Sequence, residues 1–179
     1  ANDGLVSTAG LVMGVAGATT DRGTLLISGV AGMLAGALSM AVGEYVSVST
    51  QRDTERALIA LETRELAEDP DGELAELVDI YEAKGLSRGV ASQVAAELTA
   101  RDPVAAHLDA ELAIDPDDLT NPWHAGLASL IAFLVGAAVP LAAILLSAPS
   151  WRVPTTIVAV LVGMALTGFL VWITEYYTG

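Results

Sequence analysis

Long stretches without a charged side chain occupy both ends of the chain. They cover residues 4–20, 23–43, 125–150 and 153–174. The hydrocarbon core of a bilayer is about 30 Å thick, so a helix needs roughly 20 apolar residues to cross it. Each run therefore predicts a membrane-spanning helix. The pattern as a whole predicts an all-α, multi-pass integral membrane protein in contact with a lipid bilayer.

Short charged breaks group these runs into two pairs. Asp21 and Arg22 separate the first two runs, and Arg152 separates the last two. Each pair predicts a helical hairpin with a short external turn, which places both chain ends and the intervening segment on one side of the membrane. Arg52 and Arg56 follow the second run and favour that side as cytoplasmic.

Small residues crowd the first pair of runs. Gly10 with Gly14, and Gly32 with Gly36, are each four positions apart. This spacing lets membrane helices approach closely. We therefore expect the first two helices to pack against other parts of the protein.

A strongly acidic segment lies between the two pairs. Residues 50–120 hold 18 of the 22 acidic and 6 of the 8 basic residues. Such segregation excludes an ordinary single-core globular protein. The net charge of −14 and the lack of a basic stripe exclude a nucleic-acid partner, and the lack of cysteine excludes thiolate ligands. We divide the chain into residues 1–49 and 121–179, with two membrane helices each, and the helical domain 50–120.

Proline and N-cap residues predict where the helices of the acidic segment begin. No Gly or Pro interrupts the second membrane helix before Glu68, so it should project beyond the membrane. Residues 115–121 are expected to form a linker before Pro122. Three further helices should end near residues 83, 100 and 114, with N-terminal signals at Asp69-Pro70, Ser87 and Asp102-Pro103.

Acidic side chains recur at helical spacing within this segment. Residues three or four apart share one helix face, and like charges about 4 Å apart repel by some 4 kcal/mol at an effective dielectric near 20. A divalent cation would compensate this repulsion, and carboxylates with an imidazole suit Fe, Mn or Zn better than Cu(I). A solvated acidic helix face is the simpler alternative. The pairs are Glu62 with Glu65, Glu73 with Glu76, and His107 with Glu111.

Other metal sites and catalysis fit the sequence poorly. Neither His107 nor His124 follows a Glu by three positions, as a ferritin-like di-iron centre requires. Residues 115–118 lack the Gly and the final Glu of an EF-hand loop. The tail, with Glu175 and two tyrosines, offers no catalytic constellation, and we do not expect an enzyme.

Three polar or soft side chains lie at or near membrane depth. Asp3 stands at the mouth of the first run, Glu44 ends the second, and Met40 precedes Glu44 by one helical turn. Ionisable groups at membrane depth are costly, which makes them candidates for functional residues. The alternatives are acids that reach the water at the interface and a methionine that fills a gap between helices.

Four segments, taken in order, resemble the vacuolar iron transporter family. They are residues 3–8 (DGLVST), 35–40 (AGALSM), 43–47 (GEYVS) and 51–55 (QRDTE), and the resemblance extends over about residues 1–170. It implies a homodimer in the cell membrane or a vacuolar-type membrane. Such a protein exchanges Fe²⁺, and often Mn²⁺, for protons. The first two helices line the pathway, and a cytoplasmic domain gathers the metal before entry.

The resemblance also assigns residues by position. Asp3 and Met40 match the acid and the methionine of the pathway, with Glu44 as a candidate for an intramembrane glutamate that Gly32 replaces. His107 stands where plant-type members have a methionine ligand, which changes the softness of the ligand set. The sequence does not rank Fe²⁺ against the alternatives Mn²⁺, Co²⁺ and Zn²⁺. Five glutamates match the cytoplasmic metal site: Glu62, Glu65, Glu73, Glu76 and Glu111.

The two chain ends depart from the family pattern. Family members have a fifth membrane helix, whereas this chain ends soon after the fourth run, so we expect a truncated or composite carboxyl end. The chain does not begin with methionine, which suggests a processed amino end. A membrane-anchored module that senses or buffers metal without transporting it is therefore the alternative function.

Overall fold

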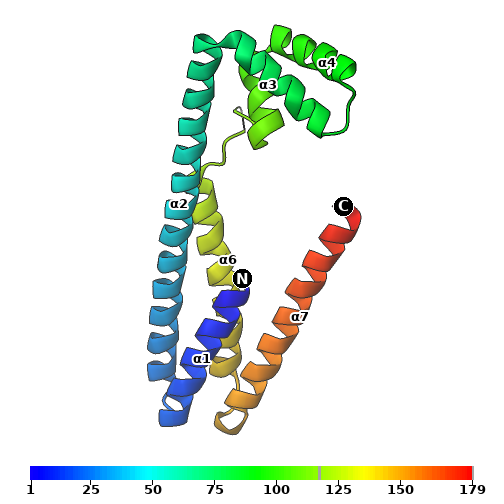
Figure 1. The fold of residues 1–179 in the computed structure, drawn as a ribbon. Coiled ribbons are helices and arrows are strands. Elements are labelled where there is room, and N and C mark those ends of the chain that lie inside the picture. The colour runs from blue at the N-terminus through cyan, green and yellow to red at the C-terminus, as the bar shows by residue number, and fades with distance from the viewer. Residues whose placement is uncertain (117, 179) are drawn as a thin grey trace. The chain divides into compact units, whose positions relative to one another are not determined.

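The computed structural model describes residues 1–116 and 118–178, and all regular secondary structure in these residues is helical (Figure 1). The prediction of an all-α protein is therefore confirmed. Two compact units divide the chain: the apolar unit, Ala1–Ser47 with Pro122–Gly179, and the acidic unit, Val48–Asn121. The elements are α1 (Asn2–Ala18), α2 (Arg22–Glu68), α3 (Pro70–Ala83), α4 (Arg88–Arg101), α5 (Pro103–His107), the π-helical turn η1 (Leu108–Leu112), α6 (Pro122–Leu146), the short 3-10 helix η2 (Pro149–Trp151) and α7 (Arg152–Thr178).

Three helical stretches of the described chain are long and apolar enough to cross a membrane. They are α2, α6 and the stretch Pro149–Thr178, which combines η2 with α7. The first predicted span corresponds to α1, whose 17 residues lie at the lower end of the length that crosses a bilayer. As predicted, α2 continues without a break to Glu68.

Apolar side chains from α1, α2 and α6 form the interior of the apolar unit. Helix α1 lies against both α6 and α7, and α6 also lies against α7 (Figure 1). Val12 of α1 is fully buried beside Leu141 and Ile144 of α6. In a neighbouring cluster, Ala37 of α2 packs against Phe133 of α6. Burial of this apolar surface holds α1, α2 and α6 together.

Glycines allow helices of the apolar unit to approach closely, at Gly4 of α1 and, as the spacing predicts, at Gly32 and Gly36 of α2. A Cβ atom at Gly32 would overlap the side chain of Leu11. A Cβ atom at Gly4 would overlap the carbonyl oxygen of Phe133, and one at Gly36 would overlap the ring of the same residue. A Cβ atom at Gly10 or Gly14 would instead meet no described atom within 4 Å beyond its own stretch of helix. Within this chain, the expected close contact through Gly10 and Gly14 is therefore absent.

Local capping interactions begin the helices of the acidic unit, largely where the sequence predicts them. The Asp69 carboxylate accepts a hydrogen bond of 3.0 Å from the N–H of Gly72, and Pro70 is the first residue of α3. The Asp102 carboxylate accepts one of 3.0 Å from the N–H of Ala105 at the start of α5. Ser87 precedes α4 as predicted, but its side chain makes no capping hydrogen bond.

The last helix of the acidic unit differs from the prediction. A single α-helix to about residue 114 was expected from its sequence, whereas α5 ends at His107 and continues as the π-helical turn η1. Ala113 then closes the turn in the left-handed conformation, with φ 52° and ψ 38°. Composition and spacing carry no signal for this change of helix type.

The helices of the acidic unit surround a small apolar core. Helix α3 contributes Leu77 and Val78, α4 contributes Ala91 and Ala95, and α5 contributes Ala106. Tyr81 and Ala110 cover its edge. This core brings the amino-terminal part of α3 and the α5–η1 segment into one compact unit, so that their polar residues can meet.

Candidate metal centre

The imidazole of His107 forms the middle of a cluster of carboxylates in the acidic unit. His107 is the last residue of α5, and Glu111 lies within η1. The Nδ1 atom of His107 is 2.9 Å from Oε1 of Glu111. The four-residue spacing seen in the sequence thus becomes a direct contact between the two side chains.

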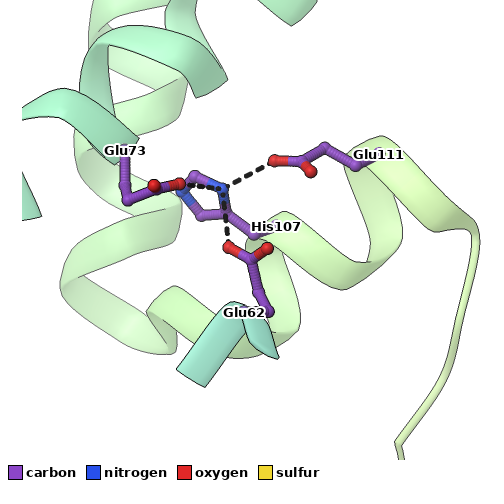
Figure 2. Close-up of side chains that lie close together, drawn as sticks. All are labelled: Glu62, Glu73, His107 and Glu111. Atoms are coloured by element: carbon purple, nitrogen blue, oxygen red, sulfur yellow. Dashed lines mark hydrogen bonds and ion pairs between the residues drawn. The ribbon is translucent and has the colours of Figure 1, made fainter. Parts of the chain in front are cut away.

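Two further carboxylates reach the same nitrogen from other helices. Oε1 of Glu62, on α2, lies 3.2 Å from Nδ1 of His107, and Oε2 of Glu73, on α3, lies 3.7 Å from it. In Figure 2 the dashed lines from the three carboxylates meet at one nitrogen of the imidazole ring. Residues 45 positions apart, from Glu62 to His107, therefore share one site.

The cluster is shielded from water on its histidine side and opens toward Glu111. The side chains of His107, Glu62, Glu73 and Glu111 are 0%, 6%, 15% and 22% exposed. Two of their buried atoms, Oε1 of Glu62 and Nε2 of His107, have no hydrogen-bond partner among the described residues. Unsatisfied buried polar atoms are costly, so the cluster has capacity for a further ligand.

The crowding of negative charge changes the protonation of the two best-shielded carboxylates. Burial raises the pKa of Glu62 above its ordinary value, and the charge of Glu111 raises it further, whereas His107 lowers it. Burial also raises the pKa of Glu73, with the charge of Glu76 as the next cause. A cation in the cluster would oppose both effects.

A divalent metal ion fits the donor set of this cluster. One ligand atom from each of Glu62, Glu73, His107 and Glu111 lies within 4.8 Å of every other. Ligand atoms about 2.1 Å from a tetrahedral ion would stand about 3.4 Å apart, so modest side-chain rotations would close the shell. Carboxylate oxygens with one imidazole suit borderline and hard divalent ions.

Two predicted ligands lie beside the four-residue cluster rather than within it. Glu65 is half-buried and Glu76 is exposed. Their negative charges nevertheless reach the cluster, because Glu65 raises the pKa of both Glu62 and Glu73. Glu65 and Glu76 therefore form an outer set of acids around the candidate metal centre.

The predicted pathway residues divide into two that share a cavity and one that lies outside it. Asp3 and Met40 line a cavity of about 280 Å³ in the apolar unit, whereas Glu44 is exposed and does not line it. The Asp3 carboxylate accepts a hydrogen bond of 2.9 Å from the Ser7 hydroxyl. The other lining residues are Thr8, Leu11, Gly32, Gly36, Ser39 and Phe133.

Hydroxyl groups in this cavity were not singled out by the sequence. Ser7 and Ser39 line it, and the buried Thr8 hydroxyl has no hydrogen-bond partner among the described residues. The available signal was position alone, because Ser7 follows Asp3 by four residues and Ser39 adjoins Met40. Together with Asp3 and Met40, these groups supply oxygen and sulfur donors to a cavity among apolar helices.

Comparison with known proteins yields one family over the whole chain. The sequence model of the VIT family matches residues 1–178. A vacuolar iron transporter of Acanthamoeba castellanii is 41% identical over 141 residues, which cover 79% of this chain and 51% of the relative. The vacuolar iron transporter homolog 2 of Arabidopsis thaliana is 34% identical over 171 residues, which cover 95% and 63%. The chain thus spans about half to two thirds of the length of these relatives.

Proposed function

The chain belongs to the VIT family, and from this premise we propose that it exports a divalent metal ion from the cytoplasm in exchange for protons. The family is one of transporters and not of enzymes. Fe²⁺ is the proposed substrate, since relatives are named as iron transporters, and Mn²⁺ is a second. The acidic unit captures the ion on the cytoplasmic side, and a homodimer in a cell or vacuolar-type membrane carries it across.

The observation that carries this proposal is the convergence of three carboxylates on Nδ1 of His107, within 3.7 Å. Such a cluster repels itself when it is empty and is stabilised by a doubly charged ion. Its opening toward Glu111 gives the ion a path in and out. Glu65 and Glu76, the outer acids, attract the cation and raise its concentration near the centre.

The cavity lined by Asp3 and Met40 is the proposed metal pathway through the apolar unit. It combines one carboxylate, one thioether and several hydroxyls among helices that are long and apolar enough to cross a membrane. In the proposed topology α1 and α2 form one hairpin and α6 and α7 the other, with the acidic unit in the cytoplasm. Glu44, which is exposed, is a secondary candidate at the entrance.

Competition between protons and metal supplies the proposed coupling. A carboxylate must lose its proton before it binds a metal ion. The raised pKa values of Glu62 and Glu73 bring protonation closer to physiological pH and so sharpen this competition. Metal is then taken up from a neutral cytoplasm, and an acidic far side favours release of the ion and uptake of protons.

Metal titration of the full-length chain in detergent, with Mn²⁺ as the probe, tests the capture step. Changing both Glu73 and Glu76 to alanine should weaken binding strongly, because Glu73 belongs to the cluster and Glu76 to the outer acids. Glu97→Ala is the matched control, since Glu97 is an exposed acid of α4. Equal Mn²⁺ affinity in the wild type, the double variant and Glu97→Ala would show that Glu73 and Glu76 belong to a solvated acidic helix face.

Proton flux in sealed proteoliposomes tests the transport step. Addition of Fe²⁺ or Mn²⁺ to the side that the acidic unit faces should drive protons in the opposite direction. Asp3→Asn and Met40→Ala should reduce this flux and leave metal titration unchanged, because both residues line the cavity of the apolar unit. A preparation that binds metal without any flux would contradict transport.

Metal buffering without transport is the second candidate function. It is favoured by one observation, namely that all four residues of the metal centre lie within the acidic unit. That unit has its own apolar core, so metal binding does not depend on the cavity of the apolar unit. Intact metal binding together with absent flux, in the wild-type chain, would support buffering.

A further inference from the structure

Lys84, the single lysine of the chain, joins the end of α3 to the π-helical turn that carries Glu111. Its Nζ atom donates a hydrogen bond of 2.9 Å to the main-chain carbonyl of Ala110. The same atom lies 5.3 Å from the centroid of the Tyr81 ring. These two contacts fix where the ammonium group sits, although neither contact belongs to the metal centre.

The turn that carries Glu111 has little stability of its own. A π-helical turn is wider than an α-helical turn and is rare, and the examples that occur are frequently at functional sites. It changes the direction in which Glu111 points relative to His107, the last residue of the preceding α-helix. The turn closes at Ala113 with φ 52°, a left-handed conformation that is unfavourable for a residue with a Cβ atom. Contacts from outside the turn must therefore help to hold it.

The contact from Lys84 has the properties that such support requires. The carbonyl groups in the last turn of a helix lack partners within the helix, and a cation near that end is favourable. A hydrogen bond from an ammonium group is stronger than one between neutral groups. Tyr81 and Ala110 also pack on the same apolar core, so the contact is anchored at both ends.

We propose that Lys84 is a positioning residue for the metal centre: by holding the carbonyl of Ala110, it fixes η1 and thereby the direction of Glu111. The metal-binding consequence of this proposal rests on the proposed function. The consequence for the backbone of η1 does not, because it concerns the metal-free protein.

Removal of Lys84 should change metal affinity in opposite directions, depending on whether its charge or its positioning role matters. Loss of a positive charge near an acidic site favours a cation, so Lys84→Met should tighten metal binding if charge alone matters. If Lys84 positions Glu111, the same substitution weakens binding, because a ligand must then be ordered by the metal itself. The sign of the change therefore separates the two explanations.

Arg88 offers a matched control within the same unit. It also carries one positive charge, but it pairs with Asp79 and Glu82, at 3.3 and 2.8 Å. Its side chain is 67% exposed. Arg88→Met therefore removes the same charge without removing support from η1, and Lys84→Arg restores a donor for the carbonyl of Ala110.

The experiment uses the full-length chain in detergent, titrated with Mn²⁺ at fixed pH and salt. Lys84→Met should weaken Mn²⁺ binding about threefold to tenfold, the scale of one typical hydrogen bond. Lys84→Arg should restore most of the wild-type Mn²⁺ affinity. Arg88→Met should bind Mn²⁺ as tightly as the wild type or more tightly. Equal or tighter binding by Lys84→Met, beside normal binding by the wild type, would overturn the proposal.

Amide hydrogen exchange of the metal-free proteins provides the second readout. Lys84→Met should exchange faster within residues 108–114 and keep wild-type rates in α4, whereas a general loss of stability would accelerate both. Lys84→Gln, a milder replacement, carries the same expectation should the methionine variant fail to fold. Unchanged exchange in residues 108–114 would overturn the proposal for Lys84, whether or not the wild type binds Mn²⁺. Absence of Mn²⁺ binding by the wild type would refute the proposed function instead.

Discussion

The guanidinium group of Arg152 donates a hydrogen bond of 2.8 Å from Nη1 to the main-chain carbonyl of Thr20, which lies 132 positions earlier in the chain. Thr20 belongs to the turn between α1 and α2, and Arg152 is the first residue of α7. The arginine is only 3% exposed. The contact therefore ties together two turns of the apolar unit through a buried charge.

Removal of this tie should destabilise the apolar unit. Arg152→Met leaves the Thr20 carbonyl without its donor, which we expect to cost about 1–3 kcal/mol. Thermal unfolding in detergent should show a midpoint lower by a few degrees. Arg22→Met removes the same charge from an exposed position two residues after Thr20 and should change the midpoint less. Equal shifts in the two variants would contradict the role of the tie.

Gly4 should tolerate no side chain, whereas Gly10 should. Gly4→Ala places a Cβ atom against the carbonyl oxygen of Phe133, so α1 and α6 must move apart, at about 1–3 kcal/mol. Gly10→Ala meets no atom of the described chain within 4 Å. The measurement is the thermal midpoint of each variant in detergent. A larger loss for Gly10→Ala would show that its open side is occupied in the assembled protein.

His107 should matter for metal binding far more than the other histidine of the chain. His107→Ala removes a proposed ligand and leaves Glu62, Glu73 and Glu111 facing one another, so Mn²⁺ affinity should fall about tenfold or more. His124→Ala changes an exposed residue of α6 and should bind normally. Isothermal titration of the full-length proteins compares them, and equal affinities would exclude His107 as a ligand.

The stability of the metal-free protein should depend on pH through Glu62. Because the folded state raises the pKa of Glu62, the folded protein holds this proton more tightly than the unfolded chain does. The resulting stabilisation is complete below the ordinary value of 4.5 and is lost as the pH rises through the raised pKa. Glu62→Gln should therefore be more stable than the wild type at neutral pH, by a margin that shrinks as the pH falls toward 4.5.

Denaturant unfolding of both proteins across this pH range measures the margin. Glu97→Gln, at an exposed position of α4, should show no such dependence relative to the wild type. Saturating Mn²⁺ should reverse the order of stability at neutral pH, since only the wild type retains the full set of proposed ligands. A margin that does not change with pH would contradict the electrostatic origin of the effect.

Local features of the fold could be predicted because their causes are local. The side chains of Asp69 and Asp102 cap the N–H groups three residues onward, and a proline follows each of them. Such interactions depend on a few neighbouring residues and are readable from sequence. The apolar runs likewise determine helix length without reference to the rest of the protein.

The metal centre could be predicted only in part, because its geometry depends on packing between helices. Spacing placed Glu62 with Glu65 and Glu73 with Glu76, but three positions on a helix differ in direction by about 60°. Only the first acid of each pair therefore faces His107. Which member faces inward follows from the apolar core around Leu77, and this is a tertiary feature that pair spacing does not encode.

The unpartnered Nε2 atom of His107 has a consequence for how firmly an ion would be retained. A histidine that ligates metal through one ring nitrogen usually donates its other N–H to an acceptor, which makes the ring a stronger base. Among the described residues His107 has no such acceptor, so its imidazole would be a comparatively weak electron donor. Long-term storage of a metal ion calls for a histidine whose second N–H has an acceptor. A metal ion bound at this cluster would exchange quickly, as a transient binding site requires.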